Sequence, residues 1–331
     1  MNPGASIAGV AMALPERLVS NEQIAAELGV DADWIAKRTG TLERPWALDS
    51  ERLTEFAAVA SRGALAHAGV DPSEVDLVLV ATSTADDITP NAAPLVAGLI
   101  GAGRAGALDV GAACTGWLSA LAMACGQIES GRARYALVVG ADFLSRFLDV
   151  SDRDTAPLFA DGAGAAVLAA TESATGRVGP IVLRSDHSGS HLIRLSRGDH
   201  IRMEGQESFR VGVASLAQVT AEALAASACG LDDIDLFVYH QANSRIIRAV
   251  GQRLDLPPER VVDYVGRFAN ASTATLPIAL TVAQAEGRLE PGARVLLAAF
   301  GGGLTWGATV VEWTAPAPAL ANGHPSVMPT V

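Results

Sequence analysis

The sequence predicts a layered α/β fold built from two similar halves. Short apolar segments typical of buried strands alternate with longer stretches of helical periodicity along most of the 331 residues. Half of the residues are hydrophobic and only 18% are charged, a composition typical of tightly packed enzymes rather than of disordered chains. One strand pattern also occurs twice, which indicates an internal duplication.

The repeated pattern consists of two buried strands separated by helical segments. In the first copy the strands are expected over 75–82 and 134–140, and in the second copy over 234–240 and 294–300. In both copies an acidic turn precedes the first strand. Corresponding strand ends of duplicated halves meet at a central seam, so side chains that are distant in sequence can come together there.

The duplication gives the expected domain organisation. We expect an N-terminal half over 1–172 and a C-terminal half over 173–314. The remaining stretch, 315–331, lacks apolar periodicity and is expected to be a disordered tail.

Charge and targeting signals exclude several classes of protein. The formal net charge of −12 gives no overall attraction to nucleic acid or to an anionic membrane. The N-terminus does not resemble a signal peptide, and no stretch reaches the ~20 apolar residues of a spanning helix. The three cysteines include no CxxC pair and cannot form a disulfide framework, which indicates a reduced, cytoplasmic protein. We expect neither a nucleic acid nor a membrane partner.

One of the cysteines, Cys114, stands where an apolar strand pattern meets small residues and then a long helical pattern. The free backbone N–H groups and the dipole of a helix N-terminus favour a thiolate there. His240 and Asn270, from the second half, complete a possible Cys/His/Asn site for acyl transfer. Each residue alone is more often structural, so the hypothesis depends on all three occurring together.

Several motifs, taken in order, resemble the β-ketoacyl-acyl-carrier-protein synthase III family of thiolase-fold condensing enzymes over roughly residues 5 to 313. The matching segments are WIAKRTG at 34–40, DVGAACTGW at 109–117, DGAGAAVL at 161–168, HQAN at 240–243, Asn270, and FGGGLTWG at 300–307. The resemblance implies a thiolase-like fold in which the two halves form a five-layered αβαβα core. It also implies a homodimer that requires no metal and no redox cofactor.

The activity implied by the resemblance is a two-step acyl transfer. Cys114 would take an acyl group from acyl-CoA as substrate, and condensation with a malonyl-acyl-carrier protein would follow with loss of CO₂, as in a fatty acid or polyketide starter step. By resemblance, His240 and Asn270 would donate hydrogen bonds to the enolate. The backbone N–H groups of Cys114 and Gly302 would form the oxyanion hole.

The resemblance further implies a route for CoA or for the acyl carrier. Trp34 and Arg153 would hold the adenine ring between them. The other residues expected along this route or at the docking face of the carrier protein are Arg38, Arg210, Asn243 and Arg245. Surface ion pairs are the alternative role for any one of these arginines. Thr89 stands where some members carry a bulky phenylalanine that closes the acyl pocket across the dimer, so a longer or branched primer is expected.

Two functions remain open at this stage. The chain is either a decarboxylating condensing enzyme or an acyltransferase of the same fold that passes the Cys114-bound acyl group to a hydroxyl, amine or other carbon nucleophile. The presence of Asn270 favours the condensing enzyme, because stabilisation of the enolate needs hydrogen-bond donors from both Asn270 and His240. The sequence does not identify the primer or the pathway, which could be fatty acid, polyketide or antibiotic biosynthesis.

Overall fold

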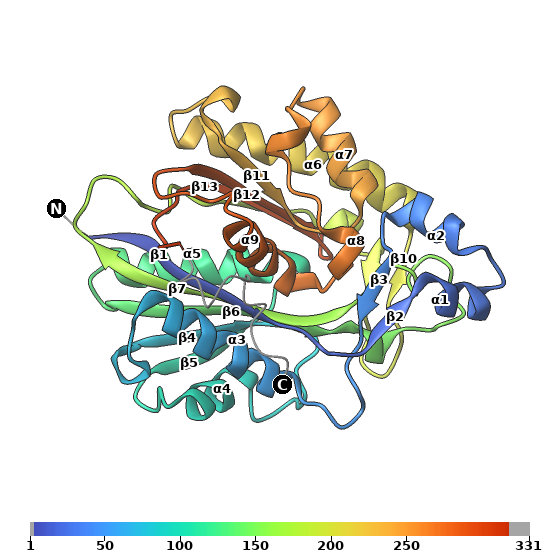
Figure 1. Ribbon diagram of the computed structural model, residues 1–331, viewed down its shortest axis with the longest axis horizontal. Helices are drawn as coiled ribbons and strands as arrows, with labels where there is room; N and C mark the ends of the chain where they lie inside the picture. Colours follow the sequence, from blue (N-terminus) through green and yellow to red (C-terminus); the bar gives the residue numbers. More distant parts are fainter. Residues whose placement is uncertain (1–2, 318–331) are drawn as a thin grey trace.

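The computed structural model describes residues 3–317, and its N-terminal part contains a five-stranded sheet (Figure 1). Its strands are, in spatial order, β1 (Gly4–Ala13), β7 (Asp161–Thr171), β6 (Tyr135–Phe143), β4 (Leu77–Ala81) and β5 (Gly106–Val110). β4 is parallel to β6 and β5, whereas β7 is antiparallel to β6 and β1. The helices α3 (Leu53–Ala68) and α4 (Ala92–Ile100) cover one face, and α5 (Gly116–Glu129) packs on the other.

The C-terminal part contains a four-stranded sheet with a similar pairing. Its strands are, in spatial order, β11 (Leu236–Tyr239), β12 (Arg294–Gly301), β13 (Thr305–Glu312) and β8 (Val182–Ser185). The helices that pack on it are α6 (Gly205–Ala226), α7 (Ser244–Arg253) and α9 (Thr275–Ala285). α6 and α7 lie on the outer face, and α9 lies on the inner face (Figure 1).

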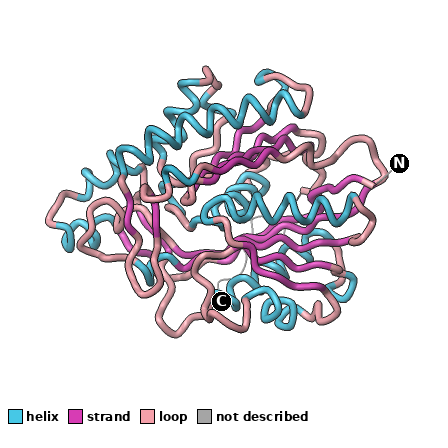
Figure 2. The backbone as a smooth tube through the Cα atoms, turned by 180° about the vertical axis from the view of Figure 1, so that it is seen from behind, coloured by secondary structure: helices cyan, strands magenta, loops and turns pink. Residues whose placement is uncertain are grey.

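The two sheets and their helices form five layers. In Figures 1 and 2, α5 and α9 occupy the layer between the sheets, and the other helices form the outermost layers. Buried aliphatic side chains such as Val138, Leu121 and Leu297 join both sheets to this central layer in one hydrophobic cluster. The layered αβαβα core expected from the sequence is confirmed.

The repeated sequence pattern corresponds to equivalent hydrogen bonds in the two sheets. The N–H of Asp76 donates to the Tyr135 carbonyl at 3.0 Å, and the N–H of Asp235 donates to the Arg294 carbonyl at 2.9 Å. The Asp76 carboxylate accepts from the N–H of Tyr135 at 3.1 Å, and the Asp235 carboxylate accepts from the N–H of Arg294 at 2.8 Å. Each acidic turn therefore joins the starts of two parallel strands, β4 and β6 or β11 and β12.

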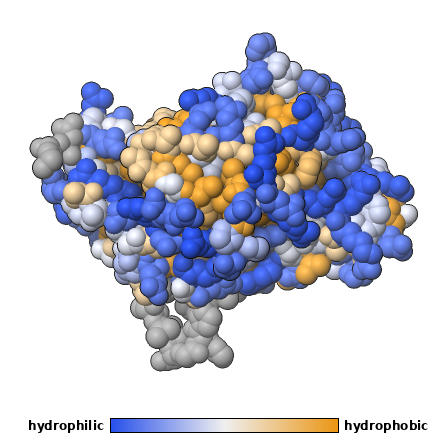
Figure 3. Space-filling view, turned by 90° about the horizontal axis from the view of Figure 1, so that it is seen from above, coloured by the Kyte–Doolittle hydropathy of each residue, from blue (hydrophilic) through white to orange (hydrophobic). Residues whose placement is uncertain are grey.

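Shorter elements cover the end of the layers at which the site lies. They are β2 (Leu18–Ser20), α1 (Asn21–Leu28), α2 (Ala32–Thr39), β3 (Glu43–Pro45), β9 (Ile193–Arg194), β10 (Arg202–Met203) and α8 (Val265–Phe268). Most of these pack around a separate apolar cluster that includes Ile35 and Trp46. Seen from above, apolar side chains gather near the centre of the surface, and hydrophilic side chains cover most of its margin (Figure 3).

Packing extends past the expected end of the C-terminal half. Ala315 is fully buried, and the Pro316 carbonyl accepts hydrogen bonds from His67 Nε2 at 2.8 Å and Gln284 Nε2 at 3.0 Å. The rest of the expected tail, 318–331, lies outside the described residues. Among the helices of residues 3–317, none combines the length and apolar character that a bilayer crossing requires.

Candidate active site

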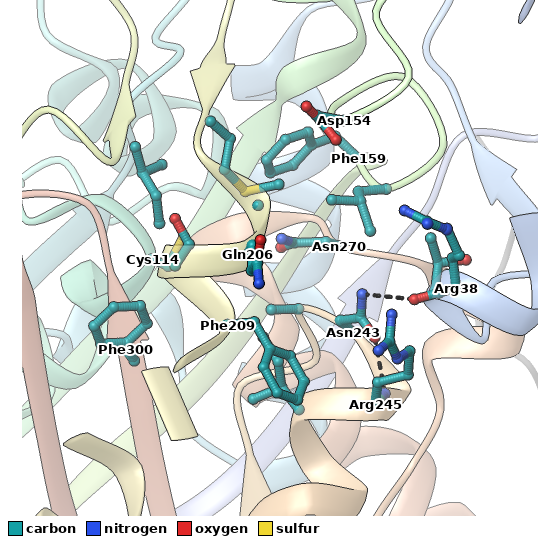
Figure 4. A pocket seen from close by; sticks show the side chains of 18 of the residues that line it. Arg38, Cys114, Asp154, Phe159, Gln206, Phe209, Asn243, Arg245, Asn270 and Phe300 are labelled. Carbon is teal, nitrogen blue, oxygen red and sulfur yellow. Dashed lines mark hydrogen bonds between the residues drawn. The ribbon is translucent and has the colours of Figure 1, made fainter. Parts of the chain in front are cut away.

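The three residues predicted for acyl transfer line one cavity of about 410 Å³. Cys114 comes from the N-terminal sheet region, whereas His240 and Asn270 come from the C-terminal one. In Figure 4, Cys114 and Arg38 lie at opposite sides of the cavity, with Asn270 between them. The fold therefore brings together side chains that are separated by more than a hundred positions.

Cys114 lies in a 3₁₀ turn, Ala113–Thr115, directly between the end of β5 and the start of α5. The turn can form here because its neighbours are small. A Cβ added to Gly301 would lie 2.8 Å from Cys114 Cβ and 2.9 Å from Cys114 N. Gly301, the last residue of β12, thus allows two backbone segments to approach each other beside the thiol.

Burial raises the pKa of the Cys114 thiol to about 11. The negative charge of Asp142 also raises this pKa, whereas the Ser272 hydroxyl and the backbone N–H groups of Cys114 and Gly302 lower it. The direction of this shift is opposite to the sequence-based expectation of a favoured thiolate, because the loss of hydration outweighs these donors. The two N–H groups that lower this pKa are those predicted for the oxyanion hole.

His240 follows the last residue of β11, and its side chain is 3% exposed. Its backbone N–H donates to the Ala298 carbonyl of β12 at 2.8 Å. Its Nδ1 lies 2.6 Å from the hydroxyl oxygen of Thr275, at the start of α9. Burial lowers the pKa of His240 to about 4, so the imidazole is neutral near pH 7.

Asn270 is held to the N-terminal half by its backbone. Its N–H donates to the Leu158 carbonyl and its carbonyl accepts from the Ala160 N–H, both at 3.0 Å. The side-chain Oδ1 accepts from the Ser272 N–H at 2.9 Å. Because Oδ1 accepts this bond, the amide Nδ2 is available as a hydrogen-bond donor.

Sequence analysis did not identify Ser272 and Asp142, which both act on Cys114. The Ser272 hydroxyl donates to Cys114 Sγ at 3.6 Å. The fully buried Asp142 carboxylate accepts from the Thr273 N–H at 3.1 Å and from the Thr273 hydroxyl at 2.8 Å. The Ser and Thr that closely follow Asn270 could have drawn attention to this loop, whereas nothing in the sequence around Asp142 indicates its role.

Five of the residues predicted to bind CoA or a carrier also line the cavity, and they are Trp34, Arg38, Arg153, Asn243 and Arg245. The Arg38 guanidinium lies over the Trp34 ring, 4.9 Å from its centroid. Asn243 caps α7 by accepting from the Arg245 N–H at 2.8 Å, and it donates to the Arg38 carbonyl at 3.2 Å (Figure 4). One end of the cavity is therefore cationic and carries an aromatic surface.

Two of the predicted residues lie outside this cavity. Arg210, on α6, is exposed and pairs with Glu207, with 3.0 Å between Nε and Oε2. Thr89 is also exposed. Among residues 3–317, no group of three or more histidine, cysteine, aspartate or glutamate side chains could hold a metal ion.

Comparison with known proteins agrees with this geometry. The family 3-oxoacyl-[acyl-carrier-protein] synthase III matches residues 108–187, and the C-terminal part of that family matches residues 224–313. The β-ketoacyl-[acyl-carrier-protein] synthase III of Granulibacter bethesdensis is 44% identical over 92% of this chain and 98% of its own length. The chain belongs to the 3-oxoacyl-[acyl-carrier-protein] synthase III family. The Rhizorhabdus wittichii member is 42% identical over 93% of this chain and 99% of its own length.

Solved structures of the synthase III family have the same fold. The Aquifex aeolicus enzyme has a TM-score of 0.91 and 36% identity, and the match covers 94% of this chain and all of that one. The priming β-ketosynthase of the R1128 polyketide pathway also has a TM-score of 0.91, with 34% identity over 95% of this chain and 98% of its own. Synthase III relatives of this similarity thus include a polyketide priming enzyme.

Proposed function

We propose that this chain is an acyltransferase that loads an acyl group from acyl-CoA onto Cys114 and condenses it with a malonyl-acyl-carrier protein, releasing CO₂. The observation that carries the proposal is the convergence of Cys114, His240 and Asn270 on one cavity with a cationic, aromatic end. Membership of the synthase III family supports the same reaction.

In the loading step, the Cys114 sulfur attacks the carbonyl carbon of the acyl thioester. The N–H groups of Cys114 and Gly302 stabilise the oxyanion of the tetrahedral intermediate. The intermediate collapses with release of CoA as a thiol, so that one thioester replaces another. Because the pKa of Cys114 is raised to about 11, the thiol is protonated at rest and loses its proton as it reacts.

In the condensing step, the malonyl thioester loses CO₂ and its carbonyl oxygen becomes that of an enolate. The amide Nδ2 of Asn270 donates a hydrogen bond to this oxygen. The neutral ring of His240 donates a second one from Nε2, which carries the ring proton when the Thr275 hydroxyl donates to Nδ1. The enolate carbon then attacks the acyl-Cys114 carbonyl and releases the sulfur. No step in this scheme calls for a metal or a redox cofactor.

The outer part of the cavity fits the nucleotide end of CoA and the arm of a carrier protein. In this proposal Trp34 and Arg153 hold adenine, and Arg38, Asn243 and Arg245 bind along the route to the thiol; their position on the wall of one cavity supports these roles. Arg210, which is exposed beyond the cavity, supports docking of an acidic carrier protein.

We also propose that the enzyme works as a cytoplasmic homodimer. β5 is an edge strand of the five-stranded sheet, and Leu108 on it is 38% exposed, so a second copy could cover this edge. Thr89 does not line the cavity of its own chain, and its role in the acyl pocket therefore requires the second copy. Light scattering after size-exclusion chromatography measures the mass; a monomer at micromolar concentration would contradict the dimer.

The function is tested by following the two steps separately. Intact-protein mass spectrometry with a panel of acyl-CoAs should show one acyl addition, and Cys114→Ala should abolish it. Adding malonyl-acyl-carrier protein to the acylated enzyme should then release CO₂. His240→Ala and Asn270→Ala should keep the loading step and lose at least about 100-fold of the CO₂ release. Acyl transfer to an added alcohol or amine without CO₂ release would overturn the condensing function.

A further inference from the structure

Ser272 contacts the reacting sulfur, bonds directly to Asn270 and is linked to His240 through Thr275. Its hydroxyl donates to Cys114 Sγ at 3.6 Å, and its N–H donates to Asn270 Oδ1 at 2.9 Å. The Thr275 hydroxyl oxygen lies 3.1 Å from the Ser272 carbonyl oxygen and 2.6 Å from His240 Nδ1. One residue of this loop is therefore linked to all three side chains of the proposed mechanism.

The backbone of Ser272 is held in a conformation that side chains other than glycine rarely adopt, with φ at +47°. Such a conformation persists only where the surrounding structure imposes it, and it is found frequently at functional sites. Here the next residue, Thr273, is fixed by two hydrogen bonds to the buried Asp142 carboxylate. The fold thus holds the Ser272 hydroxyl against the sulfur despite the strain.

The sulfur needs such a donor because, within residues 3–317, no cationic group contributes to the pKa of Cys114. The titratable groups packed around it are Asp142 of β6, whose charge opposes a thiolate, and His240, whose low pKa keeps it neutral. In Figure 4, the labelled arginines Arg38 and Arg245 lie on the opposite side of the cavity. Negative charge on the sulfur must therefore be stabilised by hydrogen bonds, and Ser272 supplies the side-chain donor.

We propose that Ser272 is a further catalytic residue of the loading step, in which its hydroxyl stabilises negative charge on the Cys114 sulfur. This inference rests on the proposed function. As the Cys114 S–H bond breaks, the sulfur bonds to the acyl carbon, the bond from that carbon to the CoA sulfur breaks, and the proton lost by Cys114 is the one gained by the CoA sulfur. The Ser272 hydroxyl keeps its own proton throughout.

The test uses two variants and needs no acyl-CoA. Ser272→Ala and Ser272→Gly both remove the hydroxyl and keep the backbone bonds to Asn270 and Thr275, and the glycine variant also relieves the strained φ. Alkylation of Cys114 by iodoacetamide is followed by peptide mass spectrometry from pH 6 to 10. Because the pKa of the thiol is already about 11, the alkylation rate follows the thiolate fraction throughout this range. Loss of the donor should raise that pKa by about one unit, so both variants should be alkylated about tenfold more slowly than the wild type at each pH.

An unchanged alkylation profile in either folded variant would overturn the inference. If Ser272→Ala alone were slow, backbone strain rather than the hydroxyl would explain the effect, and the inference would fail. Loading from acyl-CoA should fall by the same factor as alkylation, whereas CO₂ release from bound malonyl thioester should persist. A different result would separate the two proposals. If alkylation is slower in both variants than in the wild type, but the wild type accepts no acyl-CoA, the proposed function fails and the stabilisation of the thiolate by Ser272 stands.

Discussion

Acid should destabilise this protein through His240, and the size of the effect follows from its burial. The folded protein lowers the pKa of His240 from 6.5 to about 4, because the 3% exposed ring cannot be hydrated when charged. The unfolded chain therefore binds a proton as pH falls through 6.5, while the folded protein remains neutral at this residue. The contribution of His240 to stability is complete above pH 6.5 and is lost as pH falls towards 4.

At pH 5 this loss corresponds to about 2 kcal/mol of unfolding free energy relative to pH 8. Urea unfolding of the wild-type protein and of His240→Gln, measured between pH 8 and pH 5, isolates the effect because all other titrating groups are shared. Between pH 8 and pH 5, the free energy of unfolding should fall by about 2 kcal/mol less for the variant than for the wild-type protein. Parallel profiles for the two proteins would refute the assignment of a low pKa to His240.

Three further substitutions test the geometry of the cavity. Gly301→Ala places a methyl group within 3 Å of two Cys114 atoms, so the rate of acyl loading should fall at least tenfold. Gly126→Ala is the control, because that position has open space around it and the variant should load normally. Equal loading rates in the two variants would contradict the close approach of Gly301 to Cys114. Trp34→Ala removes the aromatic surface under Arg38 and should raise KM for acyl-CoA about tenfold with little change in kcat. An unchanged KM would show that adenine does not bind at Trp34. Thr89→Phe should reduce activity towards long or branched primers and spare short ones, and an unchanged chain-length profile would show that Thr89 does not shape the pocket.

The sequence by itself determined the fold class and the candidate catalytic residues. Strand and helix periodicity depends on neighbouring residues, so the buried strands β4, β6, β11 and β12 could be predicted from their patterns. Cys114, His240 and Asn270 could be selected because each belongs to a short motif, and the motifs occur in the order of one family. Local pattern and motif order were sufficient for both predictions.

Only the tertiary structure decided how these residues behave. The pKa of Cys114 is raised rather than lowered, since burial depends on how the two halves enclose the thiol. Asp142 and Thr273 are 131 positions apart, and no local pattern relates them, yet their hydrogen bonds hold the loop that carries Ser272. Hydration and long-range hydrogen bonding arise from packing between distant segments, and for that reason they could not be read from the chain.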